Sequence, residues 1–149
     1  MKTKAILFVD DEQMVLCSLQ RGFLDEPYNL LFADSGQKAL DLLEHNEVHI
    51  VVTDMRMPEM SGLEFLKIVK SRWPDVVRVI LSGFTDRQAM IDAINQGEIF
   101  KFITKPWRLE EDFKLVIQQA ARYYDNNVEA NGLKKELEQR RRAAMTKAQ

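Results

Sequence analysis

The amino-acid sequence predicts an α/β fold, a doubly wound parallel sheet of five strands with helices on both faces. Five short apolar runs recur along the chain, and several are apolar almost throughout, as strands covered on both faces of a parallel sheet are. The segments between the runs repeat their apolar residues with helical spacing. Strand and helix therefore alternate five times, which is the order typical of a single doubly wound sheet.

The predicted strands and helices follow one another in a regular order. The strands are expected at residues 5–9 (AILFV), 29–33 (NLLFA), 50–53 (IVVT), 78–81 (RVIL) and 100–103 (FKFI). The apolar stripes of the helices lie within residues 15–24, 39–43, 63–69, 90–94 and 109–120. We expect the last helix to continue into the C-terminal residues, because these are mainly helix formers.

Several helix boundaries are marked by capping signals. Pro74 and Gly97 stand where two of the predicted helices should end. Pairs that match a capping box, or come close to it, are Ser61 with Glu64, Thr85 with Gln88, and Asp34 with Gln37.

Composition and charge exclude several classes of protein. The chain has 149 residues, 46% of them apolar and 30% charged, which fits one compact domain. A net charge of −2 argues against a protein whose main surface covers nucleic acid. No apolar run approaches the ~20 residues of a membrane-spanning helix, and the run at residues 5–9 is too short for a signal peptide. We therefore expect a cytoplasmic protein, with the single cysteine, Cys17, as a buried helix thiol in a reducing compartment.

The polar residues that follow the first, third, fourth and fifth predicted strands are candidate site residues. In open parallel sheets the functional site lies at the carboxyl ends of the strands, so these residues share one edge. Carboxylates crowded there repel one another unless a cation lies between them. Oxygen ligands without histidine or thiolate favour Mg²⁺ or Mn²⁺ and argue against zinc. The residues concerned are Asp10 and Asp11, then Asp54, then Ser82, then Thr104 and Lys105.

The same edge is suited to a phosphoryl group. Mg²⁺ commonly takes one or two carboxylates together with a phosphate oxygen. Lys105 supplies a compact positive charge, and Ser82 supplies a hydroxyl donor. An aspartate carboxylate can attack phosphorus to give an aspartyl phosphate, although spacing alone leaves open which aspartate does so.

Four motifs together resemble the receiver domain of two-component response regulators, over residues 4 to about 124. They are FVDDE (residues 8–12), VVTDMRMPEMSG (51–62), VILSG (79–83) and FITKPW (102–107). The resemblance implies a (βα)5 flavodoxin-like receiver fold with strand order 2-1-3-4-5. It also implies that the chain is the N-terminal part of a multidomain response regulator.

The resemblance also assigns roles to particular residues. Asp54 would be the phosphoacceptor, and Ser82 and Lys105 would bind the phosphoryl group. Asp10, Asp11, Asp54 and the backbone carbonyl of Met55 would hold Mg²⁺, with Mn²⁺ as a substitute. Phe102 would be the aromatic switch residue, although it lacks the hydroxyl of the more common tyrosine. The Lys105–Pro106 peptide bond would be cis.

A signalling role follows from these assignments. The expected donor is a sensor histidine kinase or a phosphotransfer protein, and the only reactions expected of the domain itself are its own phosphorylation and slow dephosphorylation. We expect Ser82 to move toward the phosphoryl group and Phe102 to fill the vacated space. The face built by residues 86–124 would then change and control an output domain, a partner protein or homodimerisation.

Two residues beside the site are predicted to tune the lifetime of the phosphorylated state. Arg56 lies two residues beyond Asp54, and Phe84 lies two residues beyond Ser82. Neither side chain can orient an attacking water as an amide or carboxylate would, so slow self-dephosphorylation is expected. The alternative is that both are ordinary loop residues.

Residues 125–149 form a separate region in charge and composition. They contain six basic and four acidic side chains, a net charge of +2, so residues 1–124 carry −4. We interpret them as a helical linker toward an output domain that this chain lacks, and nucleic-acid contact is expected only through that domain. Leu133 and Leu137 are followed at the next seam positions by Arg140 and Ala144, which disfavours a self-sufficient coiled coil.

Three alternatives remain open. The domain could act alone in a phosphorelay. A phosphohydrolase using Asp54 would turn over small phosphate esters repeatedly, but it usually needs an acid or base two positions later, where Arg56 stands. A flavin-binding protein of the same architecture would be yellow, and the acidic edge argues against an anionic cofactor there.

Overall fold

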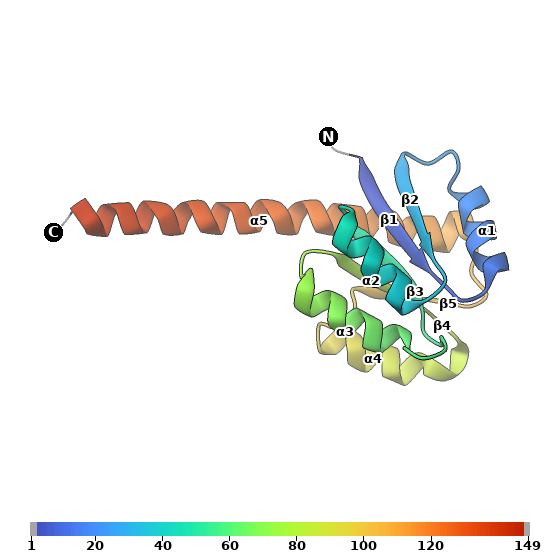
Figure 1. The fold of residues 1–149 in the computed structure, drawn as a ribbon. Helices are drawn as coiled ribbons and strands as arrows, with labels where there is room; N and C mark the ends of the chain where they lie inside the picture. The colour runs from blue at the N-terminus through green and yellow to red at the C-terminus, as the bar shows by residue number, and fades with distance from the viewer. Residues whose placement is uncertain (1–2, 148–149) are drawn as a thin grey trace.

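The computed structural model describes residues 3–147 and has one parallel sheet with helices on both faces (Figure 1). Its strands are β1 (Lys4–Val9), β2 (Tyr28–Ala33), β3 (Ile50–Asp54), β4 (Val77–Ser82) and β5 (Lys101–Thr104). Their order in the sheet is β2-β1-β3-β4-β5, and each neighbouring pair is parallel. The predicted fold class and strand order are confirmed.

The helices divide the core into two layers. The helices are α1 (Gln13–Gly22), α2 (Gly36–His45), α3 (Gly62–Arg72), α4 (Arg87–Asn95) and α5 (Lys114–Lys147). Helices α2, α3 and α4 cover one face of the sheet, and α1 and α5 cover the other. Successive strand residues point to opposite faces, so in β1 Leu7 packs in the first layer and Phe8 in the second. This double burial explains why the central strands β1 and β3 are mostly apolar.

The predicted caps are partly right. The Ser61 hydroxyl accepts a hydrogen bond from the Glu64 amide at 3.2 Å, as predicted. Helix α2 is capped by Ser35 rather than Asp34, one residue later than expected. The Thr85 cap is wrong, because a short 3₁₀ turn (Phe84–Asp86) precedes α4 and places Asp86 at the N-cap position.

Some residues assigned to the core lie outside it. Cys17 is exposed, because it lies off the buried face of α1 that Leu16 and Leu19 form. Leu24 is 75% exposed, because α1 ends at Gly22 and the chain turns away before this residue. In α4 the buried residues are Met90 and Ala93, whereas Ile91 and Ile94 are partly exposed. Surface apolar residues on α4 are therefore more numerous than the stripe predicts.

Helix α5 begins on the sheet and continues far beyond it (Figure 1). At the amino ends of β1 and β3, the Tyr124 ring packs edge-on against His49, and Asp125 pairs with Lys4 at 2.9 Å. All side chains of residues 128–146 are exposed, so this part of the helix projects from the domain. The expected continuation of the last helix is confirmed. Within residues 3–147, no helix combines the length and apolar character needed to cross a membrane.

Candidate functional site

The register of the strands brings the predicted site residues to one edge of the sheet. Asp54, the last residue of β3, pairs with Leu81 on β4, so Ser82 lies one step further along the same edge. Ser82 in turn pairs with Thr104 on β5, and the Lys105 amide donates to the Ser82 carbonyl at 2.9 Å. Asp10 follows β1, next to β3 in the sheet. The strand ends therefore assemble the site, although a helix separates each strand from the next along the chain.

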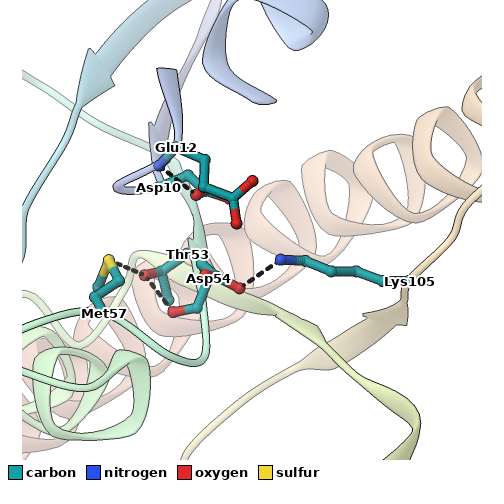
Figure 2. A network of polar contacts seen from close by, with 6 residues as sticks. All are labelled: Asp10, Glu12, Thr53, Asp54, Met57 and Lys105. Carbon is teal, nitrogen blue, oxygen red and sulfur yellow. Dashed lines mark hydrogen bonds and ion pairs between the residues drawn. The ribbon is translucent and has the colours of Figure 1, made fainter. Parts of the chain in front are cut away.

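The Asp54 side chain is held by a cation, Lys105, which follows β5 two strands away in the sheet. Lys105 Nζ donates to Asp54 Oδ1 at 2.9 Å, as Figure 2 shows. Burial lowers the pKa of Lys105, but the bond to Asp54 and the charges of Asp10 and Glu12 outweigh this effect and raise that pKa above its ordinary value. Lys105 therefore stays a cation over the acceptor carboxylate. Its peptide bond to Pro106 is cis, as expected.

The backbone carbonyl of Asp54 is held in place by Thr53 and Gly62. Thr53 Oγ1 donates to the Asp54 carbonyl at 3.1 Å and lies 4.0 Å from Met57 Sδ (Figure 2). Gly62, the first residue of α3, approaches so closely that a Cβ atom there would collide with the same carbonyl oxygen. Close packing against the Asp54 carbonyl therefore explains why a glycine stands at position 62.

Three carboxylates converge beside this ion pair. One oxygen from each of Asp10, Asp11 and Asp54 lies within 4.8 Å of the others. Asp10 is only 1% exposed, and its Oδ1 accepts a hydrogen bond from the Glu12 amide at 2.9 Å. Burial raises the pKa of Asp10 to about 6; the Glu12 amide opposes this rise and the negative charge of Asp54 adds to it. The cluster is therefore costly to ionise without a cation.

A divalent cation with oxygen ligands fits this cluster. Asp10 Oδ2 is buried and has no hydrogen-bond partner among the residues that the structure describes. Buried carboxylate oxygens normally have a partner, so this atom is suited to a metal ion. The Met55 carbonyl accepts a hydrogen bond from the Gly62 amide at 2.8 Å and keeps a second lone pair, so it can serve as a further ligand.

A cavity of about 230 Å³ opens beside Asp54 and Lys105. Its wall includes an ion pair that the sequence did not reveal, in which Arg56 Nη2 donates to Asp86 Oδ1 at 2.7 Å. Asp86 is 7% exposed, so its carboxylate is buried behind the exposed Arg56 side chain. No motif marked Asp86, because an acid at the start of a helix is usually a cap. The complete lining is Glu12, Asp54, Met55, Arg56, Gly83, Thr85, Asp86 and Lys105.

The remaining predicted residues lie at different depths. Ser82 is buried at the end of β4 and is 1% exposed. Phe102 on β5 is partly buried against the layer of α2, α3 and α4. The side chain of Phe84 lies outside the described part of the chain, so its tuning role stays a prediction.

Fold and site together define a class of protein, and comparison with known proteins agrees. Residues 6–117 match the response regulator receiver domain family. The hydrogenase transcriptional regulatory protein HoxA of Cupriavidus necator is 41% identical over 106 residues, which are 71% of this chain and 22% of HoxA. This chain therefore belongs to the response regulator receiver domain family, and it spans less than a quarter of the length of that relative.

Solved structures show the same fold. An uncharacterized protein from Neptuniibacter caesariensis is 40% identical, with a TM-score of 0.79 over 86% of this chain and 96% of that one. The signal receiver domain of an HD domain-containing protein from Pseudomonas fluorescens Pf-5 is 32% identical, with a TM-score of 0.80 over 87% of this chain and 94% of that one. Both solved structures thus resemble this chain over nearly their whole length, whereas the longer HoxA protein does so only in part.

Proposed function

We propose that this receiver domain accepts a phosphoryl group on Asp54 from a sensor histidine kinase or a phosphotransfer protein, and that the reaction requires Mg²⁺. The observation that carries the proposal is the Lys105–Asp54 ion pair at the border of the carboxylate cluster. A lone aspartate at the end of a strand is usually a helix cap. Asp54 is buried, paired with a lysine and close to two other acids, and this arrangement is suited to phosphoryl transfer.

The chemistry is a displacement at phosphorus. A carboxylate oxygen of Asp54 forms the new P–O bond, while the bond from phosphorus to the donor's histidine nitrogen breaks and its electrons stay with the leaving group. Lys105 neutralises charge on the incoming phosphoryl group. Asp10, Asp11, Asp54 and the Met55 carbonyl would hold the Mg²⁺ ion, which would supply further positive charge at the phosphoryl oxygens.

The response to phosphorylation is proposed to pass through Ser82 and Phe102. Phosphorylation makes the charge at Asp54 more negative, about −1.5 to −2, and adds hydrogen-bond acceptor oxygens. A bond from the Ser82 hydroxyl is worth roughly 1.5 to 3 kcal/mol, enough to change a two-state population at least tenfold. Phe102 also lines a cavity of about 410 Å³ between β5 and α5. This cavity lies on the face of residues 86–124, which we propose as the surface that contacts an output domain, a partner or a second copy.

The exposed part of α5 is proposed to lead toward an output domain. The HoxA relative is a transcriptional regulatory protein more than four times longer than its matching region. Residues 1–124 would then form the receiver and residues 125–149 its linker.

Phosphorylation is tested by incubating the protein with acetyl phosphate and Mg²⁺ and measuring the intact mass. Wild type should gain one phosphoryl group, and the Asp54→Ala variant or wild type with EDTA should gain none. Asp34→Ala is the matched control, because Asp34 also follows a strand but lies outside the carboxylate cluster. Full labelling of the Asp54→Ala variant would overturn the proposal.

The same experiment separates a receiver from a phosphohydrolase. A receiver consumes acetyl phosphate slowly and accumulates the phosphorylated form. Repeated rapid release of phosphate from small esters, without a stable phosphorylated form, would favour the hydrolase.

A further inference from the structure

The Arg56–Asp86 ion pair connects the two loops that border the phosphoryl cavity. Arg56 lies in the loop between β3 and α3, and Asp86 ends the 3₁₀ turn between β4 and α4. The pair is 30 residues apart in sequence, and both members line the cavity together with Asp54. It is thus placed to sense the charge at Asp54 and to act on the start of α4.

The Asp86 side chain can form either of two interactions, a helix cap on α4 or an ion pair with Arg56. It occupies the N-cap position of α4, where an aspartate normally accepts a hydrogen bond from the second or third amide of the helix. Its side chain makes no such bond and is bound to Arg56 instead. Its backbone, with φ −95° and ψ 5°, belongs to the 3₁₀ turn rather than to the extended conformation of a usual N-cap. The pair therefore holds this residue in a conformation that excludes capping.

Arg56 also has a second potential partner. Its side chain is 74% exposed, and among the described residues its polar partner is Asp86. A phosphoryl group on Asp54 would add an anion of about −1.5 to −2 to the same cavity, and a guanidinium binds phosphate oxygens in pairs. The same anion would repel the Asp86 carboxylate.

We propose that the Arg56–Asp86 pair is a phosphate-sensitive latch on α4. Without phosphate, Arg56 holds Asp86 and the 3₁₀ turn in place. With phosphate on Asp54, Arg56 binds the phosphoryl oxygens, and the released Asp86 caps α4 through the amides of Gln88 or Ala89. Arg56 is then a positioning residue for α4, in addition to any effect on phosphate lifetime. This inference rests on the proposed phosphorylation of Asp54.

The competition is tested first in the unphosphorylated full chain, by amide hydrogen exchange. Arg56→Gln frees Asp86, so exchange at Gln88 and Ala89 should slow about fivefold, the equivalent of one N-cap bond. Arg56→Lys keeps an ion pair and should behave as wild type. Asp86→Asn loses the charge pair but can still cap, so it should resemble Arg56→Gln.

Two further variants control for general effects. Arg72→Gln removes another arginine–carboxylate pair between two elements, the Arg72–Glu44 bond of α3 and α2, and should leave exchange at the start of α4 unchanged. Adding Asp86→Ala to Arg56→Gln removes the cap and should abolish the slower exchange. Equal exchange at Gln88 and Ala89 in wild type and Arg56→Gln would overturn the latch.

The trigger is tested in wild type treated with acetyl phosphate and Mg²⁺. Exchange at Gln88 and Ala89 should slow to the level of the unphosphorylated Arg56→Gln variant. If the mass shows a phosphoryl group but exchange at these two amides is unchanged, the latch is overturned and the proposed function stands. If no phosphoryl group appears, the proposed function fails together with the trigger, while the unphosphorylated variants still decide whether Arg56 and capping compete for Asp86.

Discussion

Burial of the Asp10 carboxylate destabilises the folded protein in the absence of Mg²⁺, so replacing this residue should stabilise the protein. Asp10→Asn keeps the size of the side chain and an oxygen for the Glu12 amide, but removes the buried charge. Burial raises the pKa of Asp10 from 3.8 to about 6, so the folded protein binds this proton more tightly than the unfolded chain does. The contribution of Asp10 to stability therefore falls as the pH rises from about 4 to about 6, and is level above. Two pKa units correspond to about 3 kcal/mol.

Urea unfolding in EDTA at pH 4 and pH 7.5 measures this effect. At pH 7.5 the Asp10→Asn variant should be more stable than wild type by up to about 3 kcal/mol, and the gap should close toward pH 4. Asp25→Asn, which changes an exposed acid, is the control and should show no such gap. Equal stability of wild type and Asp10→Asn at pH 7.5 would refute the burial argument.

Magnesium should close most of this gap in stability. Binding to the folded state alone stabilises wild type by about 2.7 kcal/mol when Mg²⁺ is a hundredfold above its Kd. The Asp10→Asn variant has lost one of the clustered carboxylates and should gain much less. An equal gain in both proteins would show that Asp10 is not a ligand.

Three further predictions concern the phosphorylated state. Lys105→Met should slow phosphorylation by acetyl phosphate tenfold or more, since it removes a charge-assisted bond worth roughly 1.5 to 3 kcal/mol; a rate within twofold of wild type would contradict this. Arg56→Asn and Phe84→Glu should each speed loss of the phosphoryl group, measured by mass over time, and the tuning hypothesis fails if neither does. Ser82→Ala should still be phosphorylated but lose the accompanying NMR shift changes in residues 86–124, so a full set of changes in that variant would rule out the Ser82 coupling.

Much of the site could be predicted because it depends on position along strands. Asp10, Asp54 and Lys105 each stand at or directly after the carboxyl end of a strand, and parallel strands bring these ends to one edge whatever lies between them. The Ser61 cap was predictable for a similar reason, because its bond spans only three residues.

The errors arose where a distant partner decides the local structure. Thr85 satisfies a local capping pattern, but the helix begins later and Asp86 is bound to Arg56, thirty residues earlier in the chain. Cys17 lies within an apolar helix segment, and its exposure depends on which face of α1 meets the sheet. Such pairings leave no periodic signal in the sequence.

The sequence by itself determined the alternation of strands and helices, the family and the residues at the strand ends, because burial imposes periods that can be counted along a chain. Only the tertiary structure decided which atoms meet and which are buried: the Lys105–Asp54 bond, the buried Oδ2 of Asp10 and the Arg56–Asp86 pair. Polar contacts act over about 3 Å and need particular directions, so they exist only once the packed sheet has placed both partners.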